Sequence, residues 1–204
     1  LTTVGFSYAI FGNHVEALQH ALKALEVARA IGDLHEELQA RNALGVVYGM
    51  AEDYEESYSY FLSCLELEAA LNIETNPVTL NNCSLTNIYM GNYEVALDYG
   101  LRCLEAAEKS NHFTMQHAGR DRVAKAYIGL GEYEKAKEYV KANLENNKIA
   151  QSHMRRSHTL VNLGQILLKQ GQPEQALVHF NEALVIATKE NAMNIVFEVL
   201  KEIV

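Results

Sequence analysis

Apolar side chains recur at helical spacing between Thr159 and Leu184, with a single break. In the first half of this stretch, Leu160, Leu163 and Leu167 fall at i, i+3 and i+7, which places them on one face of a helix. The pattern breaks at Gln170–Pro173 and then resumes with a second apolar face. Glycine ends helices through a left-handed backbone, and proline suits the first turn of the next helix. The stretch therefore predicts two helices joined by a short turn, each with an apolar stripe that must pack against a neighbour.

The same helical hairpin recurs along the chain at a period of about 40 residues. The residues at the turn are Gly12, Glu52, Gly91, Gly131 and Gly171. Seven positions before each turn lies a small residue: Gly5, Gly45, Ser84, Ala124 and Gly164. Five positions after each turn lies another: Ala17, Ser57, Ala96, Ala136 and Ala176. Because bulky side chains at these positions would overpack a close crossing, the pattern predicts that the two helices of each hairpin approach closely here.

Five hairpins and one further helix account for the whole chain. The expected repeats span residues 1–33, 34–73, 77–112, 114–150 and 153–190, and the final helix spans residues 192–204. The predicted fold class is therefore all-α, a single solenoid domain over residues 1–204. The final helix is expected to cover the apolar flank of the fifth repeat with Leu200, Ile203 and Val204. Since both ends of the chain fall inside helical patterns, we expect it to be a fragment of a longer protein.

Three short motifs carry a family resemblance: NALGVVY at residues 42–48, GNYEVAL at 91–97 and GEYEKAK at 131–137. They resemble the tetratricopeptide repeat (TPR) family, and the resemblance covers essentially the whole chain. It implies a right-handed α-solenoid whose first helices line the concave side. The family's usual period is about 34 residues. The additional residues here follow the second helix of each hairpin, so we expect that helix to be longer by one to two turns.

The charge, hydrophobicity and cysteine positions of the chain argue against several classes of function. The net charge of −9 disfavours nucleic acid as a partner, because phosphates require a basic face. No run of 18 apolar residues predicts a membrane span, and no secretory leader is recognised. The three cysteines, Cys64, Cys83 and Cys103, occupy core positions, which favours free thiols in a reducing cytoplasm.

No arrangement typical of an enzyme is recognisable. The histidine pairs His112/His117 and His153/His158 are five residues apart, whereas a zinc-binding pair on a helix needs four. We therefore expect no metal, no cofactor and no catalytic residues. The acidic pair Glu36-Glu37 is expected to be solvated.

The register of the first helices predicts the residues that face the groove. The candidate binding residues are Asn42, Asn81, Asn82, Tyr89, Arg122, Lys125, Asn162, Gln165 and Lys169. An asparagine amide both donates and accepts hydrogen bonds, and the resemblance implies that such asparagines clamp the backbone of a ligand. The alternative is that asparagine is merely tolerated on an exposed face. The three cations could attract an acidic ligand, or they could serve only solubility.

Two functions follow from this reading. The first is a scaffold that binds a protein or peptide, with acidic groups, in the concave groove. The alternative is a sensory or dimerising regulatory region of a larger bacterial signalling protein. Self-association through the C-terminal helix is a further expectation, because that helix would leave apolar surface exposed.

Overall fold

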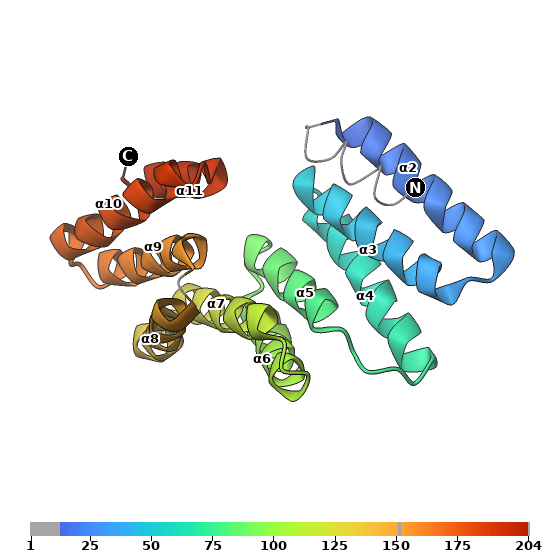
Figure 1. Ribbon diagram of the computed structural model, residues 1–204, viewed down its shortest axis with the longest axis horizontal. Coiled ribbons are helices and arrows are strands. Elements are labelled where there is room, and N and C mark those ends of the chain that lie inside the picture. The colour runs from blue at the N-terminus through green and yellow to red at the C-terminus, as the bar shows by residue number, and fades with distance from the viewer. Residues whose placement is uncertain (1–12, 151, 204) are drawn as a thin grey trace.

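The computed structural model describes residues 13–150 and 152–203, with residues 147–150 described by their backbone only. The described residues form helices and no strands, in the order shown in Figure 1. The helices are α2 (His14–Ile31), α3 (Leu34–Met50), α4 (Tyr54–Ala70), α5 (Pro77–Tyr89), α6 (Tyr93–Lys109), α7 (Phe113–Gly129), α8 (Tyr133–Ala150), α9 (His153–Lys169), α10 (Pro173–Lys189) and α11 (Met193–Ile203).

Antiparallel pairs of these helices stack along a curved path from α2 to α11 (Figure 1). The hairpins are α3/α4, α5/α6, α7/α8 and α9/α10, and α2 is the second helix of the first repeat. The first helix expected in that repeat lies outside the described residues. Each helix packs on the next, and α5 also contacts α7, α7 contacts α9, and α9 contacts α11. The first helices α5, α7 and α9 thus form one continuous layer with α11, and the described residues confirm the all-α solenoid.

The predicted close crossings occur within the hairpins. The Ser57 hydroxyl donates to the Gly45 carbonyl at 2.7 Å, and the Ser84 hydroxyl donates to the Ala96 carbonyl at 2.7 Å. At Gly164, a Cβ atom would lie 2.5 Å from the ring of Phe180. The bulk at that crossing therefore comes from an aromatic ring of the second helix, and only glycine leaves room for it.

The turns also follow the prediction. Gly91, Gly131 and Gly171 have φ of 77°, 77° and 73°, and Glu52 adopts the same left-handed conformation with φ of 62°. The additional residues of the repeat, however, are not confined to the second helices. Those helices have 17 or 18 residues, and the first helices α3, α7 and α9 also have 17.

Helix α11 covers the last hairpin with a different face from the one expected. Ile195 and Val199 are fully buried in the core cluster formed with α9 and α10. Leu200 and Ile203 are 42% and 41% exposed, and Val204 lies outside the described residues. The prediction identified the capping helix but assigned its buried face wrongly, because the face is set by the position of α11 against α9 and α10.

Two side-chain expectations have opposite outcomes. Cys64, Cys83 and Cys103 are free and buried, as predicted. Glu37, expected to be solvated, is buried and pairs with Arg41 at 2.5 Å and with Arg29 at 3.0 Å. The hydrogen bonds from these two guanidinium groups lower the pKa of Glu37.

Candidate functional site

A chain of polar side chains links the first helices along the concave side. We call it the inter-repeat ladder, and it consists of Asn42, Asn81, Asn82, Asp121, Arg122 and Asn162. Its rungs join neighbouring repeats: Asn82 Nδ2 donates to Asn42 Oδ1 at 3.3 Å, Arg122 Nε to Asn81 Oδ1 at 3.0 Å, and Asn162 Nδ2 to Asp121 Oδ1 at 2.5 Å. Each rung joins the residue ten positions before the turn in one repeat to the residue nine positions before the turn in the next.

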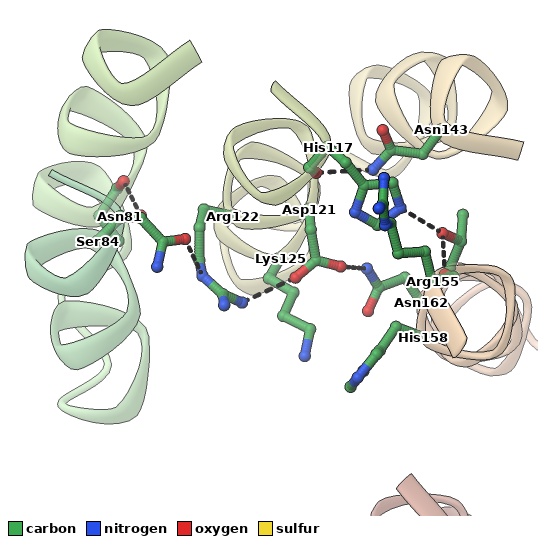
Figure 2. Close-up of polar contacts among 12 residues, drawn as sticks. Asn81, Ser84, His117, Asp121, Arg122, Lys125, Asn143, Arg155, His158 and Asn162 are labelled. Atoms are coloured by element: carbon green, nitrogen blue, oxygen red, sulfur yellow. Dashed lines mark hydrogen bonds and ion pairs between the residues drawn. The ribbon is translucent and has the colours of Figure 1, made fainter. Parts of the chain in front are cut away.

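Bonds within α5 and α7 connect the rungs into one network, and Figure 2 shows the one in α7, between Arg122 and Asp121. Asn81 Nδ2 donates to Asn82 Oδ1 at 3.2 Å, and Arg122 Nη1 donates to Asp121 Oδ2 at 2.8 Å. Asn81 and Asn162 are only 9% and 1% exposed. These two amides are therefore used to hold α5, α7 and α9 together.

Asp121 is the charged centre of the ladder. Its burial acts to raise the pKa of the carboxyl group, but the positive charges of Lys125 and Arg122 outweigh burial and lower it. The hydrogen bond from Asn162 acts in the same direction. Asp121 is thus a buried carboxylate, and its ion pair with Arg122 and its amide partner compensate for the loss of solvent.

Helix α11 reaches across the groove to the earlier repeats. Glu198 Oε1 lies 3.1 Å from Lys125 Nζ of α7, and Glu198 Oε2 lies 3.9 Å from His158 Nδ1 of α9. Gln165 Nε2 donates to Glu202 Oε1 at 3.0 Å. Two of the predicted ligand-binding side chains, Lys125 and Gln165, are therefore already engaged by α11.

Two pockets adjoin one another on the concave side. The apolar pocket, of about 290 Å³, is lined by α3, α4 and α5, with Val46, Met50 and Phe61 among its walls. The polar pocket, of about 650 Å³, is lined by α5, α7, α9 and α11. Leu85 and Tyr89 of α5 belong to both. Volumes of this size are close to those typical of ligand pockets, and the shared residues make the two pockets direct neighbours on the concave side.

The nine predicted binding residues separate into three groups. Tyr89, Arg122, Lys125 and Gln165 line the polar pocket, and Asn82 lines the apolar one. Asn42 bonds to Asn82, while Asn81 and Asn162 are buried in the ladder. Lys169 is exposed at the end of α9 and lines neither pocket.

Several pocket residues were missed by the sequence reading. Arg155, His117 and Phe197 line the polar pocket, together with Glu198 and Glu202 of α11. Arg155 could have been found from its spacing, because it precedes His158 and Asn162 by three and seven positions on the same helix. The other residues depend on how α11 and α7 sit against α9.

Because His117 is buried, we expect the free energy of unfolding to decrease measurably in acid. Burial lowers its pKa to about 4, and the nearby charge of Arg155 acts in the same direction, against the raising effect of Asp121. Since the unfolded chain takes up this proton near pH 6.5, stability is complete above pH 6.5 and is lost as the pH falls towards 4. The expected loss is about 2–3 kcal/mol. Chemical denaturation at pH 7 and pH 4.5 measures it.

The matched variants for that measurement are His117→Gln and His153→Gln. His117→Gln is expected to remove most of the decrease in the free energy of unfolding that occurs between pH 7 and pH 5. Protonation of carboxylates contributes least to the decrease in this range. His153 is exposed, and its substitution serves as the control. An unchanged profile in His117→Gln contradicts the assignment.

The described residues offer little for other chemistry. Within residues 13–150 and 152–203, no group of three or more histidine, cysteine, aspartate or glutamate side chains could hold a metal ion. None of the described helices is long and apolar enough to cross a membrane.

Comparisons with solved structures show which proteins share this fold. The TPR-like repeats of a putative kinesin light chain from Podosopora anserina superpose with a TM-score of 0.74 at 14% identity, covering 94% of each chain. NprR in complex with its cognate peptide NprX gives 0.75 at 16% identity, covering 91% of this chain and 54% of the NprR chain. YrrB, a TPR protein with an unusual peptide-binding site, gives 0.59 at 18% identity, covering 97% of this chain and 87% of YrrB.

A comparison with curated protein sequences finds no match. The family comparison is positive: a tetratricopeptide repeat model matches residues 1–70 and 113–189. These matched residues make up well over half of the chain, and they include the hairpins on both sides of α5 and α6. Together with the helical hairpins and their close crossings, this match shows that the chain belongs to the tetratricopeptide repeat family.

Proposed function

We propose that this chain is a scaffold that binds a segment of a partner protein or peptide along its concave side. The observation that carries the proposal is the pair of adjoining pockets, which share Leu85 and Tyr89. Two neighbouring pockets of this kind suit several consecutive residues of a partner better than one small molecule. The proposal assigns no catalytic step to these residues.

The relatives support the same kind of ligand. NprR has been solved with its cognate peptide, and YrrB has a peptide-binding site. Both proteins share the repeat architecture at low identity, so their ligands are not transferred residue by residue. The three buried free thiols fit a reducing compartment, and we place this function in the cytoplasm.

The accessible residues of the groove define the contacts that we assign to the partner. Tyr89 is 59% exposed and Met50 is 40% exposed, so both offer apolar surface. Asn42 and Asn82 are partly buried, and both retain hydrogen-bonding capacity beyond their mutual bond and the bond that Asn82 accepts from Asn81. The buried Asn81 and Asn162 are assigned to the scaffold rather than to the ligand.

Panning of a random dodecapeptide phage library on the immobilised chain tests the proposal. Selected peptides are expected to lose at least about tenfold in affinity with Tyr89→Ala, because an exposed aromatic anchor contributes strongly to peptide binding. Fluorescence anisotropy measures the loss. The control is Val185→Ala, whose side chain is 69% exposed on α10, outside the groove pockets. Equal affinity for both variants places the binding elsewhere and contradicts the proposal.

A second candidate function is a regulatory region of a larger bacterial signalling protein. The favouring observation is the likeness to the quorum sensor NprR from B. thuringiensis, of which this chain covers 53%. Sequencing the complete reading frame tests it. An adjoining DNA-binding or catalytic domain supports this function, and a stop codon directly after Val204 together with a start codon directly before Leu1 contradicts it.

A further inference from the structure

We infer that Arg155 is a carboxylate-binding residue, and that the groove selects peptide segments in which an acidic side chain lies close to an apolar one. This inference rests on the proposed function and specifies its ligand. It assigns the two adjoining pockets to two different side chains of the same segment.

Within residues 13–150 and 152–203, Arg155 is the partly buried cation of the polar pocket whose guanidinium group has no partner. It lines the pocket together with His117 (Figure 2). Among the described residues, no carboxylate lies within 4.0 Å of its guanidinium group, and no hydrogen bond satisfies its donors. A guanidinium presents five N–H donors in a fork that matches a carboxylate, so Arg155 has donors available for a bound carboxylate.

The other two cations at the groove centre are already committed. Arg122 donates to Asn81 and Asp121, and its side chain is 15% exposed. Lys125 pairs with Glu198, and its side chain is 19% exposed. A ligand would have to break existing contacts to reach either of them, whereas Arg155 can bind without rearrangement.

The carboxylates of the pocket are likewise engaged and do not compete for Arg155. Asp121 is held by Arg122 and Asn162, Glu198 lies against Lys125, and Glu202 accepts from Gln165. His117, next to Arg155, stays uncharged near neutral pH because burial lowers its pKa to about 4. The electrostatic field at this end of the pocket therefore favours an incoming anion.

The apolar pocket supplies the second part of the selectivity. Gly45 and Gly49 contribute no side chains to it, and Val46, Phe61 and Leu85 provide its apolar walls. Its volume of about 290 Å³ accommodates one large apolar side chain. Because Leu85 and Tyr89 border both pockets, a single short segment can place one side chain in each.

The carboxylate is assigned to a side chain within the segment rather than to its C-terminus. Besides Arg155, the polar pocket is lined by Asn194, Phe197 and Lys201 of α11. Phe197 is 59% exposed, and it offers a further apolar surface to residues beyond the acidic one. A segment that follows the groove therefore passes Arg155 with its backbone uninterrupted.

The probes for the test are fluorescein-labelled, C-terminally amidated nonapeptides of alanine and serine that carry one leucine and one glutamate. The spacing between these two residues varies from one to four positions. Matched peptides carry glutamine for glutamate or serine for leucine, and a further set lacks glutamate but ends in a free carboxylate. We expect the best glutamate peptide to bind at least about tenfold more tightly than its glutamine or serine counterpart, as measured by fluorescence anisotropy.

Two protein variants make the assignment specific. Arg155→Gln is expected to remove the preference for glutamate while leaving the affinity for the glutamine peptide unchanged. The matched control is Arg156→Gln, because Arg156 pairs with Glu182 at 2.6 Å and lies outside the groove pockets. This control is expected to keep the full preference.

The outcomes separate the inference from the proposed function. Equal binding of the glutamate and glutamine peptides, or a preference that survives in Arg155→Gln, overturns the role of Arg155 and leaves the scaffold function intact. Tight binding that needs only the free C-terminal carboxylate overturns the assignment to an internal side chain. If no peptide of any set binds the wild-type chain, the selection of acidic and apolar side chains is overturned, while the dodecapeptides selected by phage panning decide the scaffold function.

Discussion

Replacing Asp121 by alanine is expected to lower the free energy of unfolding by about 3–5 kcal/mol. The substitution removes the only described carboxylate in the middle of the inter-repeat ladder and leaves the guanidinium of Arg122 without its ion pair. It also removes the acceptor of the Asn162 amide, whose side chain is 1% exposed and cannot turn to water. A buried group left without its partner costs far more than the pair contributes when intact. Urea denaturation followed by circular dichroism measures the change.

The control for this prediction is Asp98→Ala. Asp98 pairs with Arg102 at 3.3 Å, but its side chain is 65% exposed, and that surface pair contributes little. We expect a change within about 0.5 kcal/mol. If Asp121→Ala costs no more than Asp98→Ala, the ladder is not a stabilising element.

Replacing Phe180 by alanine is expected to destabilise the chain by a similar amount, about 3–5 kcal/mol. Phe180 is 2% exposed, belongs to the core cluster of α9, α10 and α11, and occupies the space that Gly164 leaves open. Neither the glycine nor the buried alanines around it can fill the cavity. Chemical denaturation measures the effect, and a thermal melt should show a matching decrease in the unfolding midpoint.

Phe113 provides the same substitution at a site without burial. It is the first residue of α7, and its side chain is 73% exposed. Phe113→Ala is expected to change stability by less than about 0.5 kcal/mol. Equal losses in both variants would mean that the effect does not come from packing at the crossing, since alanine has the higher helix propensity.

The repeat architecture could be predicted because its signal is both periodic and physically constrained. A glycine such as Gly171 marks the left-handed turn, and a small residue such as Gly164 marks the crossing. Because both recur at the same positions, each repeat supports the assignment of the helices in the others. Glu52 shows the limit of residue identity, since it takes up the glycine conformation with φ of 62°. The period located this turn even though the residue type did not.

The groove was harder to predict, because a repeat register gives the face of a helix but not the contacts between helices. The asparagines were assigned correctly to the first helices. The pairing of Asn81 with Arg122, however, joins the position ten residues before one turn to the position nine residues before the next turn, and this offset depends on how far α7 is shifted along α5. The contact of Glu198 with Lys125 depends in the same way on the placement of α11 against α7. Sequence spacing alone contains neither shift.

The inter-repeat ladder also affects which changes in repeat number the chain can tolerate during evolution. An amide can act as donor or acceptor, so its rungs do not require a particular neighbour. Removing residues 113–152 would bring Asn81 opposite Asn162, an amide pair of the kind that Asn42 already forms with Asn82. Duplicating those residues would bring Asp121 opposite the copied Arg122, with opposite charges. Loss or gain of a whole repeat by recombination therefore leaves no ladder side chain without a hydrogen-bond partner. The solenoid can for this reason evolve by tandem duplication.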